Sequence, residues 1–288
     1  MEKQKIIMTL KDEKTILLFD IDSTLTPARQ PINKEMTDIL SRLNVAFAVV
    51  AGSHMELLKE QFFAPLFEHG FRGVFDAFIN NGPMLYRCDY REKMSIELVS
   101  SFNLRESLGE KDYQEMLNTF KEVLAKKEFQ LPPEITVSPE KITDRISMVN
   151  FIPMGRLKVE GPEEQENRKR FVEFAEKTGY RAKILTFLNE RLKRLREKKG
   201  LKILMGGQTS FDIVIDGYDK TYPLRQLVPA KFEKAIFIGD ALFPGKNDYV
   251  VQEYVDNWDK KTVCPIETVK TSGWEETIQI LKDRNFLN

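Results

Sequence analysis

Two carboxylates stand directly after an apolar run near the start of the chain. Ile16–Phe19 has the composition of a buried strand, and Asp20 and Asp22 follow it. Ligands usually bind just beyond the carboxyl end of a strand in an open α/β sheet. At such a place one carboxylate can face an incoming electrophile while the other contacts a leaving group. The Asp-x-Asp-Ser-Thr segment also suits a turn or a helix cap, so this pair alone leaves both interpretations open.

Other groups suited to phosphate chemistry recur further along the chain. Ser53 follows a second apolar run, and Asp240 follows a third, with Asn247 and Asp248 in the loop after it. Lys220 stands in a Gly-Tyr-Asp-Lys segment. Because the strand ends of a doubly wound sheet lie side by side, we expect these distant residues to converge.

Each of these residues also has a plain structural interpretation. Ser53 with Glu56 would make a capping box at a helix start, Lys220 would be a surface charge, and residues 240–248 would be a polar loop. For Ser53 the two interpretations are compatible, because a helix N-terminus also binds phosphate. The combination of these residues in this order favours a functional site.

Carboxylates that converge on one cleft repel each other unless a cation neutralises them. Oxygen ligands of this kind select Mg²⁺. A hydroxyl and an ammonium beside that cation make a phosphate site, in which an aspartate can attack phosphorus and carry the phosphoryl group as an acyl phosphate. The cation and the lysine would offset the negative charge of the phosphate.

Apolar runs separated by amphipathic helices indicate the core architecture. The runs Ile16–Phe19, Val45–Val50 and Ala235–Ile238 are continuous, and Asn33 can cap a helix between the first two. Continuous apolar strands are typical of a parallel sheet that is covered on both faces. The sequence therefore predicts an α/β fold.

The middle of the chain has a different pattern. It carries longer charged helices, as at 109–127 and 163–178, and strands that alternate more, as at 146–152 and 211–215. This predicts an inserted α+β domain over residues 83–215, within a core made of residues 1–82 and 216–288.

Composition excludes several classes of partner. The chain has 288 residues, and its 44 Lys and Arg balance its 44 Asp and Glu, so nothing favours nucleic acid or an anionic membrane. Two cysteines make neither a disulfide framework nor a zinc site, which fits a reducing cytoplasm. The polar start of the chain resembles neither a signal peptide nor a membrane span.

The order Asp-x-Asp, Ser, Lys, Gly-Asp resembles the haloacid dehalogenase (HAD) superfamily, and most closely its eukaryotic-type phosphomannomutases. The opening segment Asp20 to Gln30 looks like their signature. The likeness recurs at Gly52-Ser53, Asn81-Gly82, Pro153 to Arg156, Gly206 to Asp212, Gly217 to Lys220 and Pro244 to Asp248.

The resemblance implies a Rossmann-like core with an α/β cap, a bound Mg²⁺ and a homodimer formed through the cap. Asp20 would be the nucleophile and Asp22 the general acid and base, while Ser53 and Lys220 would hold the transferring phosphoryl group. Mg²⁺ would bind Asp20, the backbone carbonyl of Asp22, and Asp240, with Asn247 and Asp248 behind these ligands. The residues implied to grip a hexose phosphate are Arg29, Arg145, Arg156, Ser210 and Asp212.

The chain departs from the family pattern at three places. Ser23 and Lys246 each replace a glycine, and the stretch after Arg156 lacks the family's Glu-Glu-Arg, for which Lys158 could substitute only as a point charge. The leading interpretation is phosphoryl transfer on a hexose phosphate. A sugar-phosphate phosphatase and a catalytically silent sugar-phosphate sensor are the alternatives. The hexose, the carbon and the need for a hexose bisphosphate activator stay open.

Overall fold

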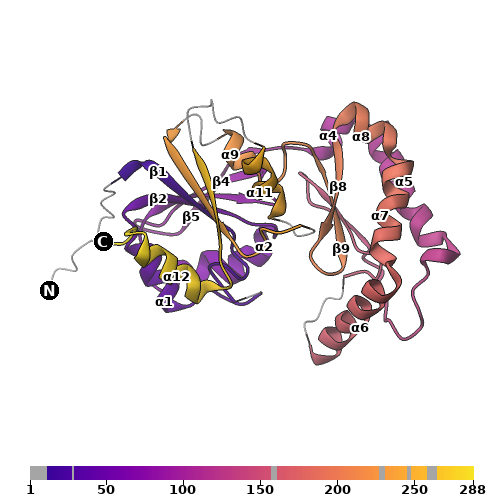
Figure 1. The fold of residues 1–288 in the computed structure, drawn as a ribbon, viewed down its shortest axis with the longest axis horizontal. Helices are drawn as coiled ribbons and strands as arrows, with labels where there is room; N and C mark the ends of the chain where they lie inside the picture. The colour runs from indigo at the N-terminus through magenta and orange to yellow at the C-terminus, as the bar shows by residue number, and fades with distance from the viewer. Residues whose placement is uncertain (1–11, 28, 157–160, 227–230, 245–247, 258–264) are drawn as a thin grey trace. The chain divides into compact units, whose positions relative to one another are not determined.

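The computed structural model describes residues 12–27, 29–156, 161–226, 231–244, 248–257 and 265–288. The chain forms two compact units (Figure 1). Unit 1 is built from the described parts of 1–101, 217–244 and 248–288, and unit 2 from those of 102–216.

A seven-stranded sheet forms the centre of unit 1, in the order β11-β10-β1-β2-β3-β4-β5. Its strands from β11 to β3 are parallel, whereas β4 and β5 are antiparallel additions. In the register of the parallel part, Leu17 lies opposite Ile236 on one side and Phe47 on the other. The strands are β1 (Asp12–Phe19), β2 (Val45–Val50), β3 (Val74–Ile79), β4 (Met84–Asp89), β5 (Ser95–Ser101), β10 (Lys234–Gly239) and β11 (Ile266–Lys270).

Apolar side chains of β1 alternate between two hydrophobic clusters, one on each face of the sheet. Leu17 and Phe19 belong to the cluster that α1 and α12 cover, and Ile16 and Leu18 to the cluster that α9 and α11 cover (Figure 1). The predicted parallel sheet covered on both faces is therefore confirmed. The helical segments of unit 1 are α1 (Lys34–Ser41), α2 (Met55–Leu58), the π-helical turn η1 (Lys59–Phe63), α3 (Ala64–Glu68), α9 (Tyr222–Gln226), α11 (Tyr249–Asp256) and α12 (Trp274–Asp283).

Unit 2 is a four-stranded antiparallel sheet, β6-β7-β9-β8, packed against helices. Its core includes a stack of aromatic rings, in which Phe151 lies 4.9 Å from Phe120 and 6.0 Å from Phe211 between centroids. Its elements are α4 (Leu104–Leu108), α5 (Glu110–Ala125), the 3₁₀ turn η2 (Lys127–Phe129), β6 (Ile142–Asp144), β7 (Val149–Phe151), α6 (Pro162–Thr178), α7 (Tyr180–Arg191), α8 (Lys193–Lys199), β8 (Leu201–Gly206) and β9 (Ser210–Ile215).

The start of unit 2 differs from the start predicted for the insertion. The sequence placed that boundary before Pro83, but residues 80–83 form the turn of the β3–β4 hairpin, which pairs Ile79 with Met84. Strands β4 and β5 extend the core sheet, so unit 2 begins only at Phe102. The second predicted boundary, before Asp216, lies next to the end of unit 2 at Asp216.

Candidate active site

The carboxylate of Asp20 is held at the end of β1, in the interior of unit 1. Its backbone N–H donates to the carbonyl of Ile238 at 3.0 Å, which continues the pairing of β1 with β10. The Lys220 ammonium, only 1% exposed, donates to Asp20 Oδ1 at 2.8 Å and also to Asp248 Oδ1. The fold thus brings Asp20 and Lys220 together, as the sequence led us to expect, and adds Asp248 in direct contact.

Three carboxylates form a cluster at this end of β1. Ligand oxygens of Asp20, Asp240 and Asp248 all lie within 4.8 Å of one another. Asp248 Oδ2 is buried and has no hydrogen-bond partner among the described residues. A Cβ on Gly239 would lie 2.6 Å from that oxygen, so the glycine leaves it room. These three carboxylates carry more negative charge than the single Lys220 ammonium balances, and the buried Asp248 Oδ2 is available as a ligand. This arrangement fits a hard divalent cation such as Mg²⁺.

The protonation of the cluster follows from its burial. Burial raises the pKa of Asp20 to about 8; the ammonium of Lys220 opposes this rise, and Asp248 adds to it. Burial and the neighbouring Asp248 likewise raise the pKa of Asp240. Burial would lower the pKa of Lys220, but Asp20 and Asp248 raise it above its ordinary value. Without a cation the cluster therefore retains a proton near neutral pH, and a bound divalent cation would favour its release.

Asp22 lies in a tight loop just beyond Asp20. The carbonyl of Ile21 accepts hydrogen bonds from the backbone N–H groups of Thr24, Leu25 and Thr26. Ser23 adopts a left-handed conformation with φ of 59°. Glycine adopts this left-handed conformation at the least cost, which explains why a glycine suits this position in the family that the sequence resembles. Asp22 Oδ1 accepts the backbone N–H of Arg29 at 2.9 Å, which ties the loop closed.

Ser53 lies in the loop after β2, the strand next to β1. Helix α2 begins at Met55 with His54 at its N-cap, so Ser53 is one residue too early to cap it, and the capping box with Glu56 is not formed. The backbone carbonyl of Ser53 accepts the N–H of Asn80 at 3.2 Å.

A polar network lies on the sheet of unit 2. Asn150 on β7 pairs in register with Asp212 on β9, and its side-chain amide donates to Asp212 Oδ1 at 2.6 Å. Arg156 donates to Asn150 Oδ1 at 3.1 Å. Burial lowers the pKa of Arg145, whereas the charge of Asp212 raises it and that of Arg156 lowers it. Arg145, Arg156 and Asp212, which the resemblance implied as part of one sugar-phosphate site, share one electrostatic cluster.

Two residues of unit 2 were missed by sequence reasoning. Asn150 interrupts an apolar strand, a signal that could have identified it. Arg181 on α7 donates to backbone carbonyls of the turn between β8 and β9, including that of Ser210 at 2.7 Å, and nothing local marks it in the sequence. The hydroxyl of Ser210 donates to the carbonyl of Gly206 at 2.9 Å.

The remaining predicted residues are placed less fully. Arg29 belongs to unit 1 and is exposed, while the other predicted sugar-binding residues belong to unit 2. Asn247, Lys158 and Lys246 lie outside the described residues. The first arginine after Arg156 is Arg168, which is half-buried on α6.

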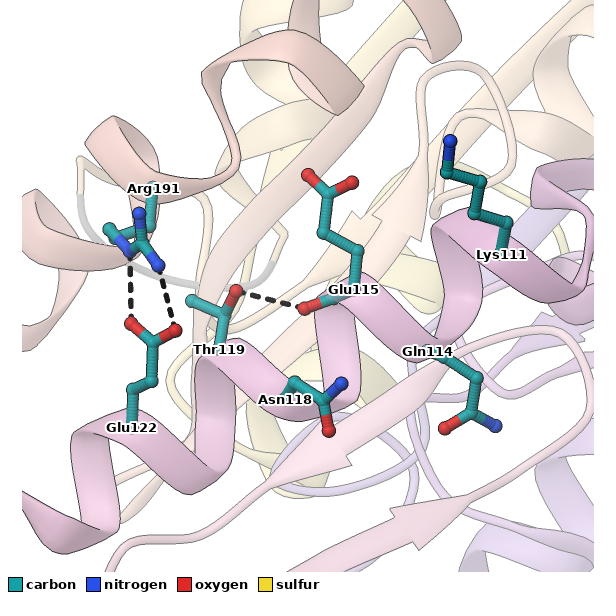
Figure 2. A pocket seen from close by; sticks show the side chains of 7 residues that line it. All are labelled: Lys111, Gln114, Glu115, Asn118, Thr119, Glu122 and Arg191. Carbon is teal, nitrogen blue, oxygen red and sulfur yellow. Dashed lines mark hydrogen bonds and ion pairs between the residues drawn. The ribbon is translucent and has the colours of Figure 1, made fainter.

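A separate hollow of about 520 Å³ lies on unit 2, and its lining includes none of the predicted site residues. Figure 2 shows its lining side chains on α5 and at the end of α7. Arg191 donates two hydrogen bonds to Glu122, at 2.9 and 2.7 Å, and Glu115 pairs with Arg194 at 2.6 Å. Because these charges neutralise each other in pairs, we do not assign the chemistry to this hollow.

Comparison with known families decides the family of the chain. The model of the family described as eukaryotic phosphomannomutase matches residues 34–283. The chain belongs to the eukaryotic phosphomannomutase family. It is similar to a probable phosphomannomutase of Caenorhabditis elegans, with 34% identity over 83% of this chain and 86% of that protein. It is also similar to phosphomannomutase 1 of Mus musculus, with 31% identity over 90% of this chain and 91% of that protein.

Solved structures support the fold. A Plasmodium falciparum IMP-nucleotidase mutant bound to IMP has a TM-score of 0.61 and 15% identity, over 95% of this chain and 69% of that one. A phosphatase of the HAD enzyme superfamily from Bacteroides thetaiotaomicron has a TM-score of 0.52 and 13% identity, over 100% of this chain and 99% of that one. The predictions of a HAD fold and of a phosphomannomutase-like enzyme are confirmed. None of the helices in the described ranges has the length and apolar character needed to cross a membrane.

Proposed function

We propose that this chain is a Mg²⁺-dependent phosphomannomutase-like enzyme, which moves the phosphoryl group of a hexose phosphate through Asp20. The contact of the Lys220 ammonium with Asp20 and Asp248 carries this proposal. It keeps a buried carboxylate oriented and charge-balanced at the end of a central strand, as an attacking carboxylate requires. Membership of the family supports the hexose phosphate as the substrate class.

In the proposed reaction an oxygen of Asp20 attacks phosphorus while the bond from phosphorus to the sugar oxygen breaks. Asp22 gives a proton to the departing oxygen, so the sugar leaves as an alcohol. In the return step a second hydroxyl of the sugar gives its proton to Asp22 and attacks phosphorus, which restores Asp20. Lys220 and the hydroxyl of Ser53 steady the phosphoryl oxygens during both steps.

The proposed cation ligands are Asp20, Asp240 and the backbone carbonyl of Asp22, and the spare oxygen of Asp248 supports adding that residue. A bound Mg²⁺ would supply Lewis-acid polarisation of the phosphoryl group and neutralise part of its charge. Asn247, which lies outside the described residues, remains proposed to support the ligands.

We further propose that unit 2 acts as the cap that recognises the sugar phosphate. Arg145 and Arg156 offer guanidinium groups that suit phosphate, and Asp212 and Ser210 offer acceptors and donors that suit sugar hydroxyls. The hydrogen bonds that join Arg156, Asn150 and Asp212 support this role, because a linked network holds its members in fixed directions. Arg29 is proposed to contribute from unit 1.

The test is an assay that separates isomerisation from hydrolysis. The full-length protein is incubated with mannose 1-phosphate, Mg²⁺ and a trace of a hexose bisphosphate, and both mannose 6-phosphate and free phosphate are followed. We expect mannose 6-phosphate to form, with turnover that depends on the bisphosphate if it acts as an activator. Free phosphate as the dominant product would replace the mutase with a sugar-phosphate phosphatase. If neither mannose 6-phosphate nor free phosphate forms, the proposal is contradicted.

A further inference from the structure

The turn between β8 and β9 is tied down by one arginine that the proposed reaction does not use. Arg181 is the second residue of α7, and its guanidinium donates to three backbone carbonyls. Nη1 donates to Gly207 at 3.1 Å, while Nη2 donates to Gly206 at 3.1 Å and to Ser210 at 2.7 Å. The guanidinium carbon also lies 5.6 Å from the centroid of the Phe211 ring. One side chain thus holds both ends of the turn.

The turn needs such an anchor because of its own composition. Gly206 and Gly207 begin it, and glycine restricts the backbone least of all residues. Gly206 cannot be replaced without cost, since a Cβ there would lie 2.7 Å from the carboxylate of Asp212. A glycine is therefore required at position 206, next to Asp212, and other contacts have to restrict the backbone of the turn.

The two groups that depend on this turn are the ones proposed to meet the sugar phosphate. Ser210 is the first residue of β9, and its hydroxyl donates to the carbonyl of Gly206, which Arg181 also binds. Asp212 lies two residues further on the same strand. Burial lowers the pKa of Arg181, and the negative charge of Asp212 opposes this shift. Movement of the turn would displace both groups together.

We propose that Arg181 is a positioning residue for the sugar-phosphate site of unit 2. It acts through the β8–β9 turn, by fixing the Ser210 hydroxyl and the Asp212 carboxylate in one arrangement. This assignment rests on the proposed function. A planar guanidinium can span three carbonyls of a turn, whereas the compact ammonium of a lysine cannot reproduce that geometry.

The experiment compares Arg181→Met and Arg181→Lys with the control Arg191→Met in the full-length protein. Arg191 lies on the same helix and makes a bidentate contact to Glu122 on the surface, so its loss matches the loss of an arginine from α7. Steady-state constants are measured with mannose 1-phosphate and with p-nitrophenyl phosphate, together with thermal midpoints. The wild-type protein in the same assay reports on the proposed function by itself.

We expect Arg181→Met to raise KM for mannose 1-phosphate roughly tenfold or more, the scale of one charged hydrogen bond. Its kcat/KM for p-nitrophenyl phosphate and the constants of Arg191→Met should stay near wild type. Arg181→Lys should fall between the wild type and Arg181→Met; it also decides the matter if Arg181→Met does not fold. In a double-mutant cycle with Ser210→Ala, the two losses should not add, because both act through one turn.

An unchanged KM in folded Arg181→Met or Arg181→Lys, with an active wild type, would overturn the positioning role and leave the proposed function intact. Equal losses on both substrates would assign Arg181 to the stability of unit 2 and would also overturn the role. Fully additive losses with Ser210→Ala would do the same. A wild-type protein that does not turn over any hexose phosphate would overturn the proposed function, and this assignment with it.

Discussion

The ammonium of Lys220 lies 2.8 Å from Asp20 Oδ1, although the two residues are 200 positions apart in the chain. Both side chains are almost fully buried, at 1% and 7% exposure. The contact joins the end of β1 to the segment by which the chain returns to unit 1. The lysine therefore has two tasks, because it orients the proposed nucleophile and balances charge in the interior.

Removal of this ammonium should affect stability as well as turnover. Lys220→Met leaves Asp20 and Asp248 without their cation, and breaking a buried ion pair costs about 3–5 kcal/mol. We expect the free energy of unfolding, measured with urea in the presence of EDTA, to fall by about that amount at neutral pH. The matched control is Lys34→Met, because Lys34 pairs with Asp38 on the exposed surface of α1. Its loss should cost no more than about 0.5 kcal/mol. Equal effects of the two variants would contradict the proposed role of Lys220.

The raised pKa of Asp20 makes the cation-free protein sensitive to pH. The folded state holds this carboxyl protonated up to a pKa of about 8, whereas the unfolded chain releases the proton near its ordinary value of about 4. The stability that this group contributes is complete below pH 4 and is lost as pH rises through about 8. In EDTA the thermal midpoint should therefore decrease as the pH rises from 5 to 8. Mg²⁺, which favours the ionised carboxylates, should raise the midpoint more at pH 8 than at pH 5.

The variant Asp20→Asn provides the control for this pH dependence. It has no proton to lose at this position, so a large part of the fall in EDTA should vanish, and the effect of Mg²⁺ should shrink. A midpoint of the wild-type protein in EDTA that rises across the same interval would contradict the assignment.

The proposed proton transfer by Asp22 can be separated from its structural contact. Asp22→Asn retains an oxygen that accepts the N–H of Arg29, so the loop can close as before. The amide cannot transfer a proton, and the loss of a general acid costs about 10² to 10⁴-fold in rate. We expect that loss with mannose 1-phosphate and a much smaller one with p-nitrophenyl phosphate, whose leaving group needs no proton. A similar loss with both substrates would refute the proton-transfer role.

Gly82, in the turn of the β3–β4 hairpin, packs closely against the segment that carries Lys220. Its φ is 117°, and a Cβ on it would lie 2.5 Å from the backbone carbonyl of Asp219. Gly82→Ala should displace Asp219 and therefore Lys220, lowering both the unfolding free energy and kcat for every phosphate substrate. Gly109→Ala is the control, since Gly109 also has a positive φ, of 82°, but no atom within 4 Å of the added Cβ.

The control isolates the cost of backbone strain, about 1–3 kcal/mol. Gly109→Ala should show that cost with unchanged kcat, while Gly82→Ala should exceed it and lose activity. If the two variants lose the same stability and both keep full kcat, the close packing of Gly82 against Asp219 does not position Lys220 for the reaction.

The sequence predicts the parallel core well because its strands carry continuous apolar runs. The strands at Ile16, Val45 and Ala235 and the cap at Asn33 are all present, and the side chain of Asn33 accepts the N–H of Met36 at 2.8 Å. Asp20 and Asp240 follow the neighbouring parallel strands β1 and β10, and they converge because strand ends in this topology share one edge. Residue type and strand order were sufficient for that part of the site.

Other features depend on information that a local pattern does not contain. Asn81-Gly82 was interpreted as a crossing between domains, although it is also a strong hairpin signal. Only the pairing of β3 with β4 decides between the two interpretations. The start of α2 at Met55 moves the cap from Ser53 to His54 by one residue, which lies within the usual uncertainty of helix boundaries. The contacts of Arg181 with residues 206–210 span more than 20 positions and arise only from tertiary packing.

The proposed reaction passes through a covalent phosphoryl group on Asp20. The most direct measurement is peptide mass spectrometry of the protein quenched in acid during turnover of mannose 1-phosphate with Mg²⁺. We predict one added phosphoryl group, located at Asp20 in the wild type and absent from Asp20→Asn, which should also lose turnover by several orders of magnitude. Wild-type turnover in folded Asp20→Asn, or a phosphoryl group located at another residue, would contradict the role of Asp20 as the nucleophile.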